Sequence, residues 1–267
     1  MSSSAPDSAS PKSVSSESAA PAHTGPSTAG ILIIGNEILT AKVQDENAPY
    51  LLQGLRELGI QVRRVHVIPD VIEEIAEEVA RFSRAYRYVF TSGGVGPTHD
   101  DVTMDGISAA FGCKLVLHPE MEQTLRKALR GVEPNKSQLK MCTLPEGAEL
   151  LHSDDLWFPL VKVSNVYVFP GIPRLLQAKF EALRDRLEGR PVHVRRVFVN
   201  SMESDIAELL NELISQFADL EVGSYPATQR VDYRTLVTIE ASDEQLVTRA
   251  VDVLVGKLPR NVLLRVE

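Results

Sequence analysis

The chain has 267 residues and a formal net charge of −8, from 28 Lys and Arg against 36 Asp and Glu. This length supports a sizeable core in one or two domains of a soluble globular protein. The acidic balance argues against binding nucleic acid or a membrane surface through bulk positive charge. No apolar run reaches the roughly 20 residues of a spanning helix. Two cysteines, Cys113 and Cys142, are too few for a disulfide framework and favour a cytoplasmic location.

Residues 1–28 form the first distinct segment and consist mainly of Ser, Ala and Pro. A segment of this composition buries too little apolar surface to offset the entropy lost on ordering. It also lacks the apolar stretch of a secretory signal. We expect a disordered tail, with a targeting role as the alternative.

Residues 29–189 alternate short apolar runs with segments of helical periodicity. Strands are predicted at 31–34, 62–68, 88–91, 114–117 and 161–169, and helices at 45–58, 72–82, 103–111, 119–131 and 174–187. Strands that alternate with helices form parallel crossovers. We therefore expect a three-layer α/β domain with a mostly parallel sheet.

Residues 190–267 have a different rhythm and are predicted to form a second, smaller α+β domain. Strands at 195–199, 220–225, 233–241 and 261–266 and helices at 203–217 and 243–257 give the order β-α-β-β-α-β. That order is the split-βαβ pattern. Domains of this kind can bind RNA, but this segment has neither a GxxG loop nor an RNP-like aromatic pair, so no nucleic-acid partner is expected.

The main candidate for chemistry is the glycine-rich stretch between the strand at 88–91 and the helix at 103–111. Glycines leave backbone amides unshielded, and the following helix N-terminus adds positive dipole, so this turn predicts an anion site at the carboxyl edge of the sheet. The alternative is a plain turn in which Asp101 caps the helix. The residues expected to bind the ligand here are Ser92, Gly93, Gly94, Gly96, Pro97, Thr98 and Thr103.

Two adjacent acids, Asp100 and Asp101, follow the glycines directly. Their carboxylates would repel each other and an anionic ligand unless a cation lay between them. Oxygen ligands of this type suit Mg²⁺, Mn²⁺ or Co²⁺, and such an ion could bridge a pyrophosphate or activate water. We therefore predict a divalent metal, with K⁺ as a further candidate ion.

Polar residues also follow the other strands. Glu37 lies after the first strand and could complete the metal site with Asp100 and Asp101, because the carboxyl ends of parallel strands meet at one edge. Asp70 follows the second strand and is a candidate for activating water, as is Asp101. The alternatives are a solvated acid at Glu37, a helix cap at Asp70 and a rigid turn at the Pro-Gly-Ile-Pro loop. Further ligand-binding candidates at this edge are Gly35, Asn47 and Gly171.

Several motifs occur in the order found in a known family. Gly93-Gly-Val-Gly-Pro97, Asp101-Val-Thr103 and Val67-Ile-Pro-Asp70 resemble the MoaB/Mog molybdopterin-binding fold, and Gly35-Asn-Glu37-Ile-Leu39 and Asp45-Glu-Asn47 resemble its CinA-like branch. The similarity is greatest to the N-terminal domain of animal-type FAD synthases. It includes Phe158-Pro-Leu160, Val166-Tyr-Val-Phe-Pro-Gly-Ile-Pro173 and Val222-Gly-Ser-Tyr-Pro226.

This resemblance implies a three-layer α/β fold, homo-oligomers, and catalytic acids at Asp70 and Asp101. It favours a metal-dependent pyrophosphatase that acts on FAD or ADP-ribose. The alternatives are a pterin- or flavin-nucleotide-binding module without its own chemistry and a molybdopterin adenylyltransferase. No Gly-Gly-Lys-Asp-type nucleotide loop of an FAD synthase transferase domain follows, so FAD synthesis by this chain is not expected.

Overall fold

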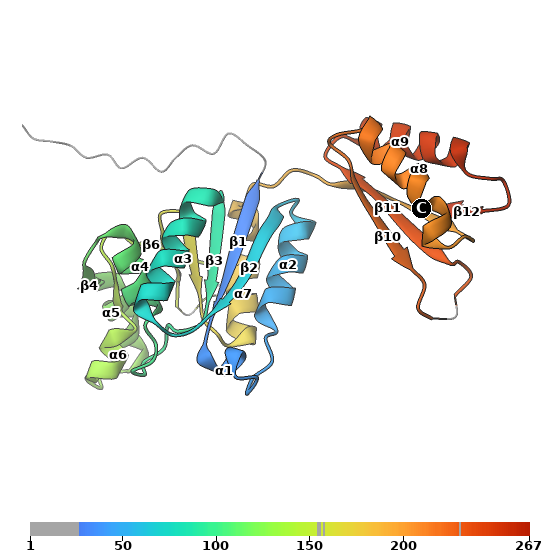
Figure 1. Ribbon diagram of the computed structural model, residues 1–267. Coiled ribbons are helices and arrows are strands. Elements are labelled where there is room, and N and C mark those ends of the chain that lie inside the picture. Colours follow the sequence, from blue (N-terminus) through green and yellow to red (C-terminus); the bar gives the residue numbers. More distant parts are fainter. Residues whose placement is uncertain (1–26, 154–155, 157, 230) are drawn as a thin grey trace, which may run out of the picture.

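The computed structural model describes residues 27–153, 156, 158–229 and 231–267. They form two units, joined by the segment between residues 186 and 193 (Figure 1). The predicted tail lies mostly outside the described residues. Its last two positions are ordered, because Ser27 is buried and Thr28 begins the first strand. None of the helices in the described ranges is long and apolar enough to cross a membrane.

The first unit is built on a six-stranded sheet in the order β2-β1-β3-β8-β7-β6. The pairs β2–β1, β1–β3 and β3–β8 are parallel, and β7 runs antiparallel to both of its neighbours. The elements of this unit are β1 (Thr28–Ile34), α1 (Asn36–Leu39), α2 (Asn47–Glu57), β2 (Gln61–Ile68), α3 (Ile72–Ala85), β3 (Tyr88–Ser92), α4 (Thr103–Phe111), β4 (Leu115–Leu117), α5 (Pro119–Ala128), α6 (Lys136–Lys140), β5 (Thr143–Pro145), β6 (Glu149–Leu151), β7 (Leu160–Val163), β8 (Val166–Phe169), α7 (Pro173–Leu183) and the 3-10 turn η1 (Arg184–Arg186).

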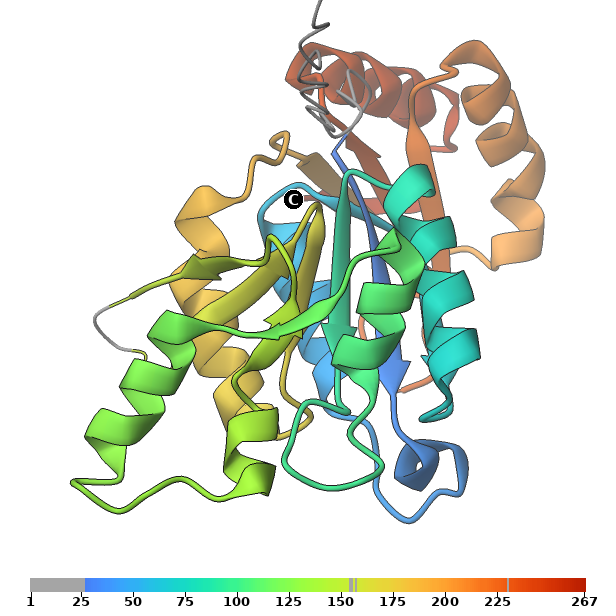
Figure 2. The same ribbon diagram turned by 90° about the vertical axis from the view of Figure 1, so that its left-hand side faces the viewer.

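Helices cover both faces of this sheet, as Figure 2 shows, which confirms the predicted three layers. On one face, α2 and α7 bury Leu55 and Phe180 against the sheet. On the other face, α3 and α4 bury Phe82 and Ile107. The apolar residues of α3 recur every three or four positions, so one stripe of the helix faces the sheet. The strand β1 is buried on both faces, as its continuous apolar run predicts.

The predicted single strand at 161–169 was wrong, because the chain folds there into the hairpin β7–β8. Ser164 takes a left-handed conformation with φ of 55°. The Asn165 side chain then donates to the backbone oxygens of Ser83 and Tyr86, at 3.0 and 2.9 Å, and so ties the turn to the end of α3. The apolar residues on both sides of Ser164 conceal this turn in the sequence. The predicted helix at 119–131 also ends earlier, at Ala128.

The second unit is a four-stranded antiparallel sheet in the order β10-β11-β9-β12, with α8 and α9 packed on one face. This arrangement is the split-βαβ pattern, because β11 lies between β9 and β10. The elements are β9 (His193–Val199), α8 (Glu203–Gln216), β10 (Glu221–Pro226), β11 (Thr235–Ala241), α9 (Glu244–Lys257) and β12 (Leu263–Val266).

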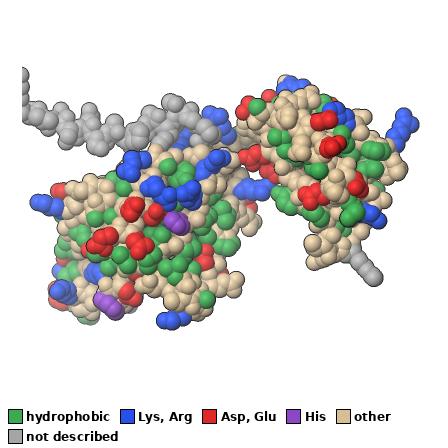
Figure 3. All heavy atoms as spheres, viewed as in Figure 1, with side chains coloured by type: hydrophobic (Ala, Val, Ile, Leu, Met, Phe, Trp, Pro, Cys, Tyr) green, Lys and Arg blue, Asp and Glu red, His purple; other side chains and the backbone are tan. Residues whose placement is uncertain are grey.

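The two units contact each other through side chains of α2 and β2. Arg56 lies 2.8 Å from both carboxylate oxygens of Glu240, and Gln61 donates to Glu221 at 2.5 Å. Acidic and basic side chains are interspersed on the face of the molecule seen in Figure 3.

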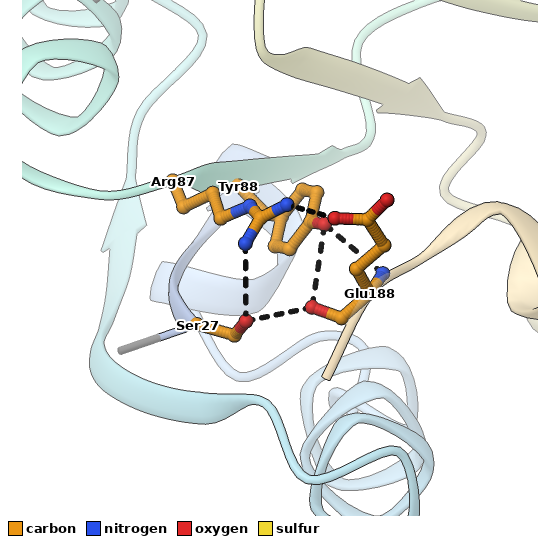
Figure 4. Close-up of polar contacts among 4 residues, drawn as sticks. All are labelled: Ser27, Arg87, Tyr88 and Glu188. Atoms are coloured by element: carbon orange, nitrogen blue, oxygen red, sulfur yellow. Dashed lines mark hydrogen bonds and ion pairs between the residues drawn. The ribbon is translucent and has the colours of Figure 1, made fainter. Parts of the chain in front are cut away.

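A polar cluster closes the edge of the first unit where β1 and β3 begin (Figure 4). Ser27 Oγ donates to the backbone oxygen of Glu188 at 2.7 Å, and Glu188 donates its own N–H to Tyr88 Oη at 3.0 Å. Arg87 forms an ion pair with the Glu188 carboxylate. The chain therefore enters and leaves this unit at neighbouring points.

Candidate functional site

The site lies at the opposite edge of the sheet, where four parallel strands end. β1 ends at Ile34, β2 at Ile68, β3 at Ser92 and β8 at Phe169, and each is followed by a loop (Figure 2). The parallel register brings these loops to one edge, where open α/β sheets bind ligands. Ser92 is the last residue of β3, and every other residue that the sequence proposed as catalytic, ligand-binding or metal-binding lies in the segments after these strands or in the first residues of the helices that follow.

The first half of the glycine-rich loop is closely packed and uses two left-handed glycines. Gly93 has φ of 108° and Gly94 has φ of 63°. A Cβ at Gly93 would lie 2.0 Å from the backbone oxygen of Ile34, and a Cβ at Gly94 would lie 2.3 Å from Thr103 Oγ1. Thr103 in turn donates its hydroxyl to the Gly93 oxygen at 2.8 Å and its N–H to the Gly94 oxygen at 3.0 Å. These contacts hold the loop against the start of α4.

The same loop presents a run of free backbone donors. Gly93 donates its N–H to the Phe169 oxygen, at 3.2 Å. Within the described residues, the N–H groups of Gly94, Val95 and Gly96 donate to no other protein atom. Consecutive free amides of this kind make an anion-binding concavity, and the N-terminus of α4 adds to its positive potential.

The second half of the loop is organised around Thr98. Asp101 Oδ2 accepts hydrogen bonds from Thr98 N at 2.8 Å and from Thr98 Oγ1 at 2.5 Å. The same hydroxyl also lies within hydrogen-bond distance of Asp100, and this bond lowers the pKa of the Asp100 carboxyl. The alternative that Asp101 caps the helix was wrong, because Val102 precedes α4 and no side chain caps it.

Asp70 lies between β2 and the glycine-rich loop. Its Oδ2 accepts a hydrogen bond from the N–H of Asn36 at 2.8 Å, and its Oδ1 lies 3.4 Å from the position that a Cβ of Gly94 would take. Partial burial raises the pKa of the Asp70 carboxyl, the Asn36 bond opposes this, and the negative charges of nearby acids raise it further. These acids are Glu37, Asp100 and Asp101. Asp70 is not a helix cap, because α3 has Val71 at that position and no side-chain cap.

Asn47, in the first turn of α2, joins the end of β3 to the loop after β8. Its Nδ2 donates to Ser92 Oγ at 2.9 Å and to the Gly171 oxygen at 2.8 Å. The Gly171 oxygen can only accept, so it fixes the orientation of the amide. The other amide atom, Oδ1, is buried and has no hydrogen-bond partner among the described residues. A buried acceptor without a donor is costly, and a ligand donor at this position would satisfy it.

The metal prediction is only partly matched by the side-chain arrangement. Asp100 and Asp101 share the Thr98 hydroxyl, but Glu37 is exposed on α1, with its carboxylate beside Gly35. In the described part of the chain, no three His, Cys, Asp or Glu side chains are grouped as a metal-binding set. Two carboxylates still fit an ion such as Mg²⁺, which takes its other ligands from water and substrate phosphates.

One charged residue near the loop was not found from the sequence. Lys140, at the end of α6, donates a hydrogen bond from Nζ to the backbone oxygen of Thr98. The two residues are 42 positions apart, and α6 has only five residues, so neither spacing nor periodicity could have indicated the contact.

The fold and the loop define the class: a mostly parallel, three-layer α/β protein with a glycine-rich loop at the carboxyl edge of its sheet. Residues 30–189 match the family model described as a probable molybdopterin binding domain, and residues 191–267 match that of the FAD synthase middle domain. The chain therefore belongs to the molybdopterin binding domain family, and the MoaB/Mog and CinA-like resemblance is confirmed.

Individual relatives agree with this assignment. A probable FAD synthase from Caenorhabditis elegans is 34% identical, over 86% of this chain and 50% of that protein. A protein from Archaeoglobus fulgidus is 36% identical, over 83% of this chain and 93% of its own length. The crystal structure of CinA, a protein with unknown function from Thermoplasma acidophilum, has a TM-score of 0.56 at 27% identity and covers 60% of this chain and 98% of its own. The chain spans about half the length of the FAD synthases it matches.

Proposed function

We propose that this protein is a metal-dependent hydrolase that cleaves the pyrophosphate bond of a dinucleotide such as FAD or ADP-ribose. The observation that carries the proposal is the position of Asp70. Its carboxyl has a raised pKa and lies beside Gly94, which belongs to the loop with the free backbone amides. A phosphate binder and a proton acceptor at one edge of the sheet are what hydrolysis of a phosphoanhydride needs.

The glycine-rich loop would bind one phosphate of the pyrophosphate. The free N–H groups of Gly94, Val95 and Gly96 are its donors, and the contacts of Thr103 keep them in place. Backbone donors that are already held in position do not have to reorganise when negative charge develops on the phosphate oxygens. An acidic protein can therefore bind this anion without a basic patch.

Asp70 would accept the proton of the attacking water. The Asn36 bond occupies Oδ2, and Oδ1 is the oxygen nearer to the loop. A carboxylate with a raised pKa is a stronger base, which favours proton transfer from water in the transition state. For FAD the water oxygen bonds to one phosphorus, the bridging oxygen leaves with the other phosphate, and the products are FMN and AMP. ADP-ribose gives AMP and ribose 5-phosphate in the same way.

A divalent metal would be held by Asp100 and Asp101 and, when bound, would neutralise charge on the phosphates. Asn47 would position the ligand, because its buried Oδ1 lacks a donor and can accept a hydrogen bond from a hydroxyl or amino group. Asn47 lies in α2 whereas the two acids lie in the glycine-rich loop, which fits a ligand that extends along the sheet edge.

The experiment is incubation of the purified protein with FAD and with ADP-ribose, each with Mg²⁺, Mn²⁺ or Co²⁺, with mass spectrometry of the products. We expect AMP with at least one metal and a large loss of rate in Asp70→Asn. Absence of AMP with every metal overturns the proposal. Tight nucleotide or pterin binding without turnover would instead identify a binding module, and adenylation of molybdopterin with ATP would identify an adenylyltransferase.

A further inference from the structure

Lys140 is a positive charge placed beside an otherwise acidic site. The helix α6 that carries it is short but anchored, because Asn135 and Gln138 form a reciprocal capping box with two bonds of 2.9 Å. From the end of this helix, the half-buried Lys140 side chain reaches the backbone oxygen of Thr98. The contact brings its ammonium group to the middle of the glycine-rich loop.

The charges around the loop are mainly negative. Four acidic side chains lie close enough at this edge for their charges to interact: Glu37, Asp70, Asp100 and Asp101. The positive charge of Lys140 has the opposite effect, and together with the exposed His99 it lowers the pKa of the Asp100 carboxyl. An ammonium group has three donors, and the Thr98 oxygen takes one, so two N–H donors remain for another acceptor. A pyrophosphate that binds in the loop brings negative charge that the neighbouring acids oppose.

We propose that Lys140 contacts a phosphate of the ligand and offsets the acidic charge of the site, while its bond to Thr98 holds the ammonium group at the loop. This inference rests on the proposed phosphate binding by the same loop. It adds a side-chain cation to the backbone amides. Because this cation lies 42 positions after Thr98, ligand affinity depends on α6 as well as on the loop. The alternative is that Lys140 only braces Thr98.

Binding of inorganic pyrophosphate and of ADP-ribose, measured by calorimetry in Mg²⁺ at two salt concentrations, separates these roles. The full chain is compared with Lys140→Met, Lys140→Arg and Lys140→Gln, and Lys136→Met is the control because Lys136 is exposed one turn earlier in α6. We expect Lys140→Met to weaken binding about tenfold and to lower the salt dependence, since one ionic contact is lost. Lys140→Arg should keep most of the affinity, and Lys136→Met should change it less than about twofold.

The glutamine variant identifies a bracing role. Gln can donate to the Thr98 oxygen without a charge, so a brace is restored by Gln as well as by Arg, whereas a phosphate contact is restored only by Arg. Equal rescue by Gln, or a salt dependence that Lys140→Met leaves unchanged, overturns the inference. Thermal unfolding of each variant confirms that it is folded.

The outcomes also separate this inference from the proposed function. If the unaltered protein hydrolyses FAD or ADP-ribose but Lys140→Met binds pyrophosphate normally, only the role of Lys140 fails. If the unaltered protein binds pyrophosphate in a Lys140-dependent manner but forms no AMP, hydrolysis fails and the Lys140 contact stands. If it binds neither pyrophosphate nor ADP-ribose, both fail.

Discussion

The Asp70 carboxylate accepts a hydrogen bond from the backbone N–H of Asn36 at 2.8 Å, which joins the loops that follow β2 and β1. This bond occupies Oδ2 and orients the carboxylate, so that Oδ1 lies near Gly94. The orientation of the proposed base is therefore set by a backbone N–H at the start of α1, directly after the neighbouring strand β1.

Replacing Asp70 by Asn should lower the rate of AMP formation by about 100-fold or more, since the amide cannot take a proton from water. Nucleotide affinity should not fall, because the change removes a negative charge near the phosphates. Initial rates and dissociation constants, measured separately, check both parts. Glu73→Gln is the matched control, since Glu73 is exposed and only three residues away. A variant that retains full rate would remove Asp70 from the mechanism.

Gly94→Ala should be more disruptive than Gly112→Ala, although both glycines have φ of 63°. Placing an Ala in the left-handed conformation costs about 1 kcal/mol of stability, and this cost is the same at both positions. A Cβ at Gly94 would meet Thr103 Oγ1 at 2.3 Å, whereas a Cβ at Gly112 would have no described atom within 4 Å beyond Gly112 and its chain neighbours. Urea unfolding and pyrophosphate affinity measure the difference. We expect Gly94→Ala to weaken binding and Gly112→Ala to leave it unchanged, and equal effects would contradict the crowding argument.

Asn47→Asp should destabilise the protein by about 2 kcal/mol and weaken ligand binding. Asn47 is 6% exposed, and a carboxylate has no N–H to donate to the Gly171 oxygen or to Ser92. The exposed Asn211 on α8 supplies the control variant, Asn211→Asp. Denaturant unfolding and calorimetry at neutral pH are the measurements. Similar stability of the two variants would mean that the Asn47 amide does not support the loops.

The stability contributed by Glu78 should depend on pH. Burial alone would raise the pKa of its carboxyl, but hydrogen bonds from Arg81 and His66 outweigh this and lower it. Because the pKa is depressed in the folded protein, the contribution is present above the ordinary Glu value and is lost as the pH falls through the folded value. Glu78→Gln should cost about 1 kcal/mol at pH 7.

This cost should disappear as the pH falls from above the ordinary pKa of a Glu carboxyl through the lowered pKa that Glu78 has in the folded protein. Unfolding in urea across that range tests the prediction, with Glu77→Gln as the control because Glu77 is exposed on the same helix. A difference between Glu78→Gln and the unaltered protein that stays constant throughout the acid range would argue against the ionic contacts.

Hydrophobic periodicity predicted most of the fold because it reports which side of each element is buried. The stripe on α3 and the apolar run of β1 were both read correctly, since each pattern follows directly from its packing. The hairpin at Ser164 was missed because its left-handed turn depends on tertiary bonds from Asn165. Local sequence does not contain that information.

The sequence predicted which residues gather at the candidate site, because the ends of the strands determine this. Asp70 and the glycine-rich loop lie at the same edge because their strands belong to one parallel sheet. Hydrogen-bond partners were not predictable: Asp101 accepts bonds from Thr98, whereas the capping role considered as the alternative is not found. The approach of Lys140 depends on how a distant segment packs, which no local motif encodes.

The bond between Ser27 and Glu188 brings together the two points where the chain enters and leaves the first unit, at the edge away from the ligand loops. Units with adjacent ends can be joined to other sequences, placed inside a host protein or circularly permuted with little disturbance of their cores. Fusion at either end would therefore leave Asp70 and the glycine-rich loop accessible. This geometry suits a unit that recurs within proteins of very different length.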